Sequence, residues 1–510
     1  MPALSGKDLV DAGWPEGPVI GELLARARFL EEEKGIVDRK YLLKLLRRHI
    51  PVPLPKLAMR PPAEAAPLAE AIVAVGAEEE RNVGAVRRQM GELLRAPLVR
   101  AGAVMPDACP VGGGTAVIPV GGVIAVENAI VPAAHSADIC CSMFATFYRC
   151  DRPTGEQLDA LAGSTRFGPG GRDESDLVHH PVLDEPVWEN RFLNGLDHKA
   201  RIHMADQGDG NHFAFLGEVG AAGDAIPGLA HGRYRVLVTH HGSRGLGSAL
   251  YKRGQAAAVK ATAKAATGIP PAAAWLDARD PEGAEYWEAL QYVSRWTRAN
   301  HESIHARFLE RLGGIAPDAT LGNEHNFVWR RGDLFLHGKG ATPAWDGQLG
   351  LIPLNMAEPI LLVAGSDNAD FLSFAPHGAG RNISRTALMR QFRDRKSHQL
   401  DAAAVAASIA ASTAGLDVRW FCGSPDLSET PIAYKDAAAV RAQIARFGLA
   451  EVIAEIRPLG CIMAGGSGRL KPWEEGYEKP LTPKQVRQIQ HRAGRRKERQ
   501  KDWGADPEEN

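Results

Sequence analysis

Short runs of β-branched and aliphatic residues alternate with helical stretches over residues 61–465, and glycine-rich turns separate them. Val117–Val120, Val236–Thr239 and Ile360–Val363 are examples of such runs, which are typical of β-strands. Most polar motifs of the chain lie in the glycine-rich turns that follow these runs. The alternation therefore predicts an α+β domain over residues 61–465, with its functional residues on loops.

A helical segment and a linker precede this domain, in residues 1–60. Apolar residues recur at helical spacing from Val19 to Arg48, with an interruption near Gly35, which predicts a pair of helices. Packing is the simpler role for this pair. The proline-rich stretch Pro51–Pro62 cannot sustain a helix, because proline removes a backbone donor, so we expect a linker there.

A basic tail follows the domain, in residues 466–510. The whole chain carries a formal net charge of -1, so composition gives no overall electrostatic reason to bind nucleic acid. Any such binding must come from local clusters of basic residues. Those of the tail are Lys484, Arg487, Arg492, Arg495, Arg496, Lys497, Arg499 and Lys501. Two interpretations stay open for them: a solvated helix, or contact with a nucleic-acid backbone.

The composition is that of a globular protein that can bury a sizeable core. Of the 510 residues, 45% are hydrophobic and 24% are charged. The 6 cysteines are too few and too scattered for the disulfide framework of a small secreted protein, so we expect reduced thiols. No run of about 18 apolar residues occurs, which argues against a membrane span. We therefore expect a soluble, cytoplasmic protein.

Five residues at turns and strand ends form a candidate metal site. Asp138 and Cys141 share a turn, His212 follows the flexible Gly-Asp-Gly, and His240 and His337 each follow a strand-like run. A single histidine in such a place is more often a hydrogen-bonded structural residue than a ligand. Together, however, a carboxylate, a thiolate and imidazoles suit a borderline divalent ion such as manganese or zinc.

Five glycine-rich or cysteine-containing motifs, taken in order, resemble those of the RtcB family of RNA ligases. The resemblance spans about residue 75 to residue 465, and it identifies the chain as a divergent member. It implies the RtcB α+β fold, in which a sheet-lined cleft with surrounding helices holds two manganese ions. The motifs are Asp138-Ile-Cys-Cys141, Gly210-Asn-His-Phe213, His240-His-Gly-Ser-Arg-Gly-Leu-Gly247, His337-Gly-Lys-Gly-Ala-Thr342 and His377-Gly-Ala-Gly-Arg381.

The resemblance implies a metal centre built around one shared thiolate. One manganese ion would be bound by Asp138, Cys141 and His212. The other would be bound by Cys141, His240 and His337. A bridging thiolate offsets the charge of two dications, which agrees with the chemistry of two-metal sites. The neighbouring Cys140 has no counterpart in the family and is expected to pack.

The resemblance also implies a covalent mechanism at His377. The family uses this histidine as the nucleophile that takes GMP from GTP, and it then joins an RNA 3′-phosphate or 2′,3′-cyclic phosphate end to a 5′-hydroxyl end. The implied partners are such RNA ends and an archease-like activator. The implied cofactor-binding residues are Asn211, Phe213, His377, Gly378, Ala379, Gly380, Arg381 and Tyr434.

The chain departs from the family pattern around the base and the metal turn. Phe215 and Met463 stand where the family has a glutamate and a lysine that contact guanine, which makes specificity for GTP doubtful. Cys109 replaces a family histidine, and Cys140 and Ser142 replace glycines of the metal turn. Two alternatives to ligation therefore stay open: a metal-dependent RNA phosphodiesterase or phosphatase, and a catalytically silent RNA-binding paralogue.

Overall fold

The computed structural model describes residues 3–52, 56–112, 114–168, 170–221, 226, 228–393 and 400–466. The basic tail expected over 466–510 lies outside these residues, apart from Gly466. The chain divides into two compact units, Met1–Met59 with Ala263–Ile269 and Arg60–Thr262 with Pro270–Asn510. None of the described helices is long and apolar enough to cross a membrane.

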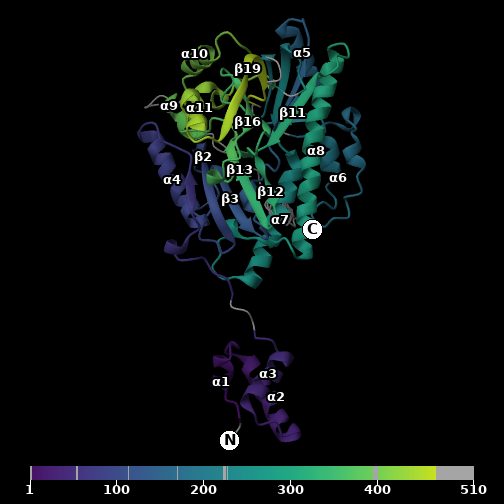
Figure 1. Ribbon diagram of the computed structural model, residues 1–510. Coiled ribbons are helices and arrows are strands. Elements are labelled where there is room, and N and C mark those ends of the chain that lie inside the picture. The colour runs from purple at the N-terminus through teal and green to yellow at the C-terminus, as the bar shows by residue number, and fades with distance from the viewer. Residues whose placement is uncertain are drawn as a thin grey trace, which may run out of the picture. The chain divides into compact units, whose positions relative to one another are not determined.

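The smaller unit consists mainly of the helices α1 (Gly6–Asp11), α2 (Pro18–Lys34) and α3 (Arg39–His49) (Figure 1). The two helices expected on either side of Gly35 are present. They are separate because Gly35 takes the left-handed conformation that ends α2. The helices pack around their own small core, made of Leu4, Leu9, Trp14, Leu23, Ala27, Leu30, Leu42 and Leu46.

The larger unit contains a five-stranded sheet with the order β1-β2-β3-β13-β12. Its first pair is parallel and the others are antiparallel. Most of β3 is buried along its length, as expected of a strand covered on both faces. The strands are β1 (Leu68–Glu70), β2 (Val99–Cys109), β3 (Val120–Glu127), β12 (Asn326–Arg331) and β13 (Leu334–Lys339).

An eight-stranded sheet has the order β11-β5-β9-β8-β19-β16-β15, and β18 adds to it by pairing with β19. Each neighbouring pair along the main path that carries the site is antiparallel. The strands are β5 (Ser142–Tyr148), β8 (Phe213–Ala221), β9 (Gly232–His241), β11 (Ala319–Glu324), β15 (Leu349–Ile352), β16 (Ile360–Gly365), β18 (Asp417–Trp420) and β19 (Ala450–Met463).

The described residues of the larger unit also form three two-stranded pairs. They are β4 (Ala129–Ile130) with β10 (Leu276–Asp277), β6 (Arg166–Phe167) with β7 (Asp206–Gly208), and β14 (Ala341–Pro343) with β17 (Phe374–Pro376).

The mixed α+β class expected from the sequence is confirmed, and two of the three example strands lie where expected. Val236–Thr239 lies in β9 and Ile360–Val363 lies in β16. The run Val117–Val120 is the exception, because only Val120 belongs to a strand. Pro119 has no backbone N–H to give to a ladder, which explains why β3 begins after it.

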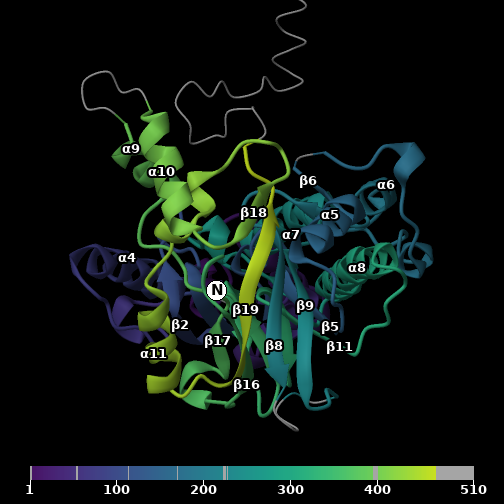
Figure 2. The same cartoon turned by 90° about the horizontal axis from the view of Figure 1, so that it is seen from above.

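Helices cover the sheets of the larger unit. Helices α5 and α8 pack against each other, α8 contacts β5 and β9, and α11 contacts β19 and β2 (Figure 2). The helices are α4 (Ala77–Leu93), α5 (Thr154–Ser164), α6 (Asp197–Ile202), α7 (Arg244–Ala265), α8 (Pro281–Arg311), α9 (Arg385–Gln391), α10 (Ala402–Ser412) and α11 (Ala437–Arg446).

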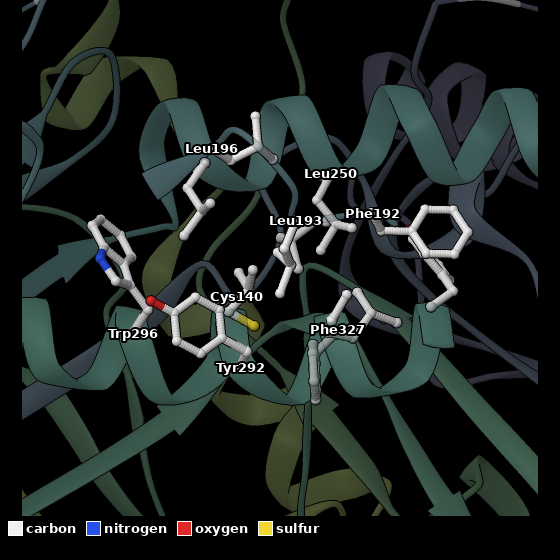
Figure 3. Packing of buried hydrophobic residues seen from close by; sticks show 14 of the residues in the cluster. Cys140, Phe192, Leu193, Leu196, Leu250, Tyr292, Trp296 and Phe327 are labelled. Atoms are coloured by element: carbon white, nitrogen blue, oxygen red, sulfur yellow. The ribbon is translucent and has the colours of Figure 1, made fainter. Parts of the chain in front are cut away.

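A hydrophobic cluster beside α8 anchors the turn that carries Asp138 and Cys141. Figure 3 shows Leu250 from α7, with Tyr292 and Trp296 from α8, around the fully buried Cys140. Cys140 therefore packs in the core, as expected. Its φ of 57° is in the left-handed region, which a non-glycine residue enters at a cost of about 1–2 kcal/mol. The turn thus keeps a glycine-like backbone although a cysteine occupies the position.

Candidate metal centre and nucleotide cavity

Four neighbouring strands bring their ends to one edge of the eight-stranded sheet. Because β11, β5, β9 and β8 are antiparallel in that order, the end of one strand lies beside the start of the next. Cys141 directly precedes β5, His212 directly precedes β8, and His240 is the next-to-last residue of β9. His325 directly follows β11, and its backbone N–H donates to the Cys141 carbonyl at 2.9 Å.

The side chains at this edge converge on the Cys141 thiol. Cys141 Sγ lies 3.2 Å from His240 Nε2 and 3.6 Å from His212 Nε2. His212 Nε2 lies 3.1 Å from Asp138 Oδ2, and His240 Nε2 lies 3.2 Å from His325 Nε2. Two groups of possible metal ligands therefore share Cys141: Asp138, Cys141 and His212, and Cys141, His240 and His325.

The hydrogen bond on the far side of the His240 ring supports its role as a ligand. His240 Nδ1 lies 3.1 Å from the Asn211 carbonyl oxygen, to which it donates its proton. Nε2 then carries the free lone pair, directed toward Cys141 and His325. Burial, and then the neighbouring His212 and His377, lower the pKa of His240 to about 3, so its ring is neutral near pH 7. A neutral imidazole is the form that binds metal.

Without a bound ion, the two acidic candidate ligands, Asp138 and Cys141, differ in how readily they lose their proton. Burial raises the pKa of Asp138, but His212 and hydrogen bonds from His212 and Cys141 outweigh it, so the pKa falls to about 2. Burial raises the pKa of the Cys141 thiol well above its usual value. A bound cation reverses this effect, because a coordinating thiol loses its proton. A largely buried set of S, N and O donors is the kind of ligand set that suits a borderline divalent ion.

His337 does not join this group. It lies within β13 of the other sheet, opposite Ile124 and Val328. The Val131 backbone N–H donates to His337 Nε2 at 2.9 Å, and His337 Nδ1 donates to the Phe335 carbonyl at 3.1 Å. Both ring nitrogens are therefore satisfied by the backbone. Among the described residues, the group that could hold a metal ion with Cys141 and His240 includes His325, and not His337 as expected from the sequence.

His377 follows β17 and lies beside the candidate metal ligands. Its ring centroid is 4.8 Å from that of His325. His377 Nδ1 lies 2.5 Å from Oδ2 of Asp107, a fully buried residue of β2. Asp107 thereby holds the proton on Nδ1 and leaves the lone pair on Nε2. This orientation is what a nucleophilic histidine requires.

The glycine loop after His377 lies directly against β2. A Cβ atom at Gly380 would meet the Asp107 carbonyl oxygen at 2.0 Å, and the φ of Gly380 is +70°. Only glycine fits both conditions. The next residue, Arg381, bonds Glu429 at 2.9 Å and stacks on the ring of Tyr434, 4.5 Å from its centroid. Arg385 also pairs with Glu429, so two guanidinium groups lie at this end of the loop.

A cavity of about 200 Å³ opens beside His377. All eight of the cofactor-binding residues expected from the sequence line it, so the structure brings them together. Its lining residues fall into a polar part and an apolar part. The polar part includes Asn211, His240, His377, Arg381, Glu429 and Tyr434. The apolar part includes Phe215, Leu354, Met356, Ile360, Cys461 and Met463.

The apolar part comes from neighbouring strands, because Phe215 of β8 pairs with Cys461 of β19. Phe215 and Met463 are buried, and their side chains have no oxygen or nitrogen that could accept from the donors of a base. Glu429 is the one carboxylate among the described lining residues. Its oxygens already accept from Arg381, Arg385 and Tyr434.

Three residues of this site were not predicted from the sequence: His325, Asp107 and Glu429. A signal for His325 was present, since it stands at the end of a strand like His240 and directly before another strand-like run. Asp107 lies 270 positions from its partner His377 in the chain, so no local pattern joins the two residues. The sequence carries no comparable signal for Glu429.

Comparisons with known proteins agree with the geometry. A family model described as "tRNA-splicing ligase RtcB" matches residues 188–464. RNA-splicing ligase RtcB of Escherichia coli (strain K12) is 28% identical over 404 residues, covering 71% of this chain and 89% of that protein. tRNA-splicing ligase RtcB of Thermococcus kodakarensis is 27% identical over 438 residues, covering 70% of this chain and 86% of that protein.

Proposed function

The chain belongs to the RtcB family, and we propose that it is an RNA ligase that acts through a guanylylated His377 beside two manganese ions. The proposed substrates are RNA 3′-phosphate or 2′,3′-cyclic phosphate ends and 5′-hydroxyl ends. One observation carries the proposal. The candidate ligand groups that share Cys141 lie next to a histidine that Asp107 orients and that lines a cavity.

The two ligand groups are proposed to hold one ion each. Asp138, Cys141 and His212 would hold the first, and Cys141, His240 and His325 the second. When bound, two dications neutralise the charge of a triphosphate. Asn211 supports this arrangement in two ways, because its carbonyl fixes the His240 ring while its side chain lines the cavity.

His377 is proposed to attack the α-phosphate of GTP through Nε2. The new P–N bond replaces the bond from the α-phosphorus to the oxygen of the leaving pyrophosphate, which keeps the electron pair. His377 keeps its Nδ1 proton and donates it in a hydrogen bond to Asp107, so the ring stays oriented throughout. Arg381 lies in the same loop and can face phosphate oxygens of the nucleotide.

Two further transfers complete the proposed ligation. An oxygen of the RNA 3′-phosphate attacks the phosphorus held by His377, which breaks the P–N bond and places GMP on the RNA end. The 5′-hydroxyl then attacks the 3′-phosphate, loses its proton and releases GMP. A 2′,3′-cyclic phosphate first requires opening by water. An archease-like activator is a proposed partner for these steps.

Incubation with labelled GTP and manganese, followed by denaturing electrophoresis, tests the proposal. We expect an acid-labile label on the protein that His377→Ala abolishes. Cleavage of a cyclic-phosphate RNA without label would instead support the phosphodiesterase or phosphatase. Neither signal, with RNA binding intact, would support the silent paralogue.

A further inference from the structure

Helix α3 of the smaller unit carries a basic surface that the proposed ligation does not use. Successive residues of a helix are rotated by roughly 100°, so Lys40, Lys44, Arg47 and Arg48 fall on one side of α3, together with Tyr41. All five side chains are exposed, and Tyr41 is 49% exposed. We call these five residues the α3 basic face.

Most cations of this face have no ion-pair partner among the described residues. No acidic residue occurs between Arg39 and His49. Arg39, on another side of the helix, pairs with Asp8, and Arg47 donates to the Ala12 carbonyl at 3.3 Å. In the described part of the chain, Lys40, Lys44 and Arg48 form no ion pair. These three cations therefore face solvent with their charges available.

The fold of the unit does not depend on the α3 basic face. The inward side of α3 consists of Leu42 and Leu46, which pack on α2 and Trp14. Asp38 caps the first turn of α3 by accepting from the Tyr41 backbone N–H at 2.7 Å. A structural role thus explains the apolar side and the cap of this helix, but it does not explain the row of cations.

We propose that the α3 basic face binds the phosphate backbone of single-stranded RNA. Exposed cations along a helix match a row of phosphates, and an exposed aromatic ring among them can stack on a base. This inference rests on RNA as the substrate of the proposed function. It assigns a second RNA-binding surface to the smaller unit, outside the catalytic cavity.

An anionic membrane fits the same face less well. A helix that lies on a membrane presents a broad apolar side to the lipid, with cations flanking it. The apolar side of α3 is already buried in the core of the unit, with Leu42 and Leu46 both fully buried. The α3 basic face therefore offers charge and one aromatic ring, which is the combination that single-stranded RNA requires.

Two full-length triple variants of equal charge test the proposal. The test variant carries Lys40→Gln, Lys44→Gln and Arg48→Gln. The control variant carries Lys7→Gln, Arg28→Gln and Lys34→Gln, at exposed positions of the same unit outside α3. Both lose three positive charges, so any difference between them reports the location of the charges and not the net charge.

The measurement is the affinity for a fluorescein-labelled oligouridylate as a function of salt concentration. We expect the test variant to bind more weakly and its log–log salt slope to decrease by about 0.7 for each lost contact, up to about 2. The control variant should match the wild type. Equal slopes for the two variants would overturn the proposal, and so would a loss of binding to phosphatidylserine vesicles with RNA binding unchanged.

Labelling of His377 by GTP separates this proposal from the proposed function. The test variant should take up the same label as the wild type, because the variant changes only α3. If neither protein is labelled but the slopes still differ, the RNA surface stands and the ligase proposal fails.

Discussion

Strand β9 contributes to two groups of buried histidines, one around His240 and one around Thr239. The two groups differ in what their ring nitrogens contact. In the first group, Nε2 of His240 and His325 face each other and the Cys141 thiol. In the second group, His301 lies between Ser142 Oγ at 3.0 Å and Thr239 Oγ1 at 2.6 Å. His305 in turn lies between Thr146 Oγ1 and Thr239 Oγ1.

Burial and pKa do not distinguish the groups. Burial lowers the pKa of His240 and of His305 to about 3 in both cases. The distinguishing property is the hydrogen-bond partner, because a ring with both nitrogens satisfied has no lone pair to give to a metal. By this criterion His337 resembles the structural histidines, whereas His325 resembles the proposed ligands.

The largest effect is expected from Cys141→Ala. This variant should lose both metal ions, because its thiol belongs to both ligand groups, whereas His212→Ala removes a ligand from only one. Metal content per chain, measured by atomic emission on purified protein, checks this. Cys140→Ala is the matched control, since that thiol is buried in the hydrophobic core and should leave the metal content unchanged. Full metal content in Cys141→Ala would show that the Cys141 thiolate is not shared by the two ions.

His325→Ala and His337→Ala test the comparison most sharply. His325→Ala should lose the ion of its group, whereas His337→Ala should keep both ions. His337→Ala should instead lower the free energy of unfolding by about 1–3 kcal/mol, because it strands the buried Val131 N–H. Metal analysis and urea unfolding of both variants give the answer. If His337→Ala lost metal and His325→Ala kept its full metal content, His337 would be the ligand and His325 the structural histidine.

His305 should make stability depend on pH. Its pKa is about 3 in the folded protein because of burial and about 6.5 when unfolded, so between these values the unfolded chain binds the extra proton. The stabilising contribution is therefore complete above about pH 6.5 and decreases as the pH falls toward 3. Each such histidine adds a slope of up to about 1.4 kcal/mol per pH unit.

Urea unfolding of the metal-free protein between neutral and mildly acidic pH measures this slope. His305→Gln should flatten it, since glutamine keeps hydrogen-bonding groups near Thr146 and Thr239 but does not titrate. Identical slopes for the wild type and His305→Gln would show that His305 does not contribute.

The smallest effect is expected at the apolar part of the cavity. Phe215 and Met463 cannot accept the N1 hydrogen and amine of guanine, and Glu429 is engaged by arginines. Unpaired donors cost about 1–3 kcal/mol, which removes most of a preference for guanine. In a competition between equal labelled GTP and ATP for His377, we expect a preference well below about a hundredfold. A larger preference for GTP would mean that another group reads the base.

Four residues of the candidate metal site could be predicted from the sequence. Asp138, Cys141, His212 and His240 stand at turns or strand ends that the β-branched runs reveal, and the structure brings them together. His337 also precedes a glycine, but β13 continues to Lys339, so its ring stays inside a sheet. Strand ends are the least certain feature of a local pattern, and a shift of two residues was enough to misplace this histidine.

Other features depend on pairing between distant segments. His325 enters the site because β11 pairs with β5, and no local pattern specifies that neighbour. Asp107 lies in a part of β2 where the register with β3 shifts, between Val104 and Cys109. Such irregularities re-aim side chains and leave little trace in the sequence. The α+β class was predictable, because it follows from alternation along the chain.

Anomalous diffraction at the manganese edge, on crystals grown with manganese, would locate the proposed ions and their ligands. We expect two peaks that share the Cys141 sulfur, one beside Asp138 and His212 and the other beside His240 and His325. A peak coordinated by His337, or a structure with no manganese bound to Cys141, would contradict it.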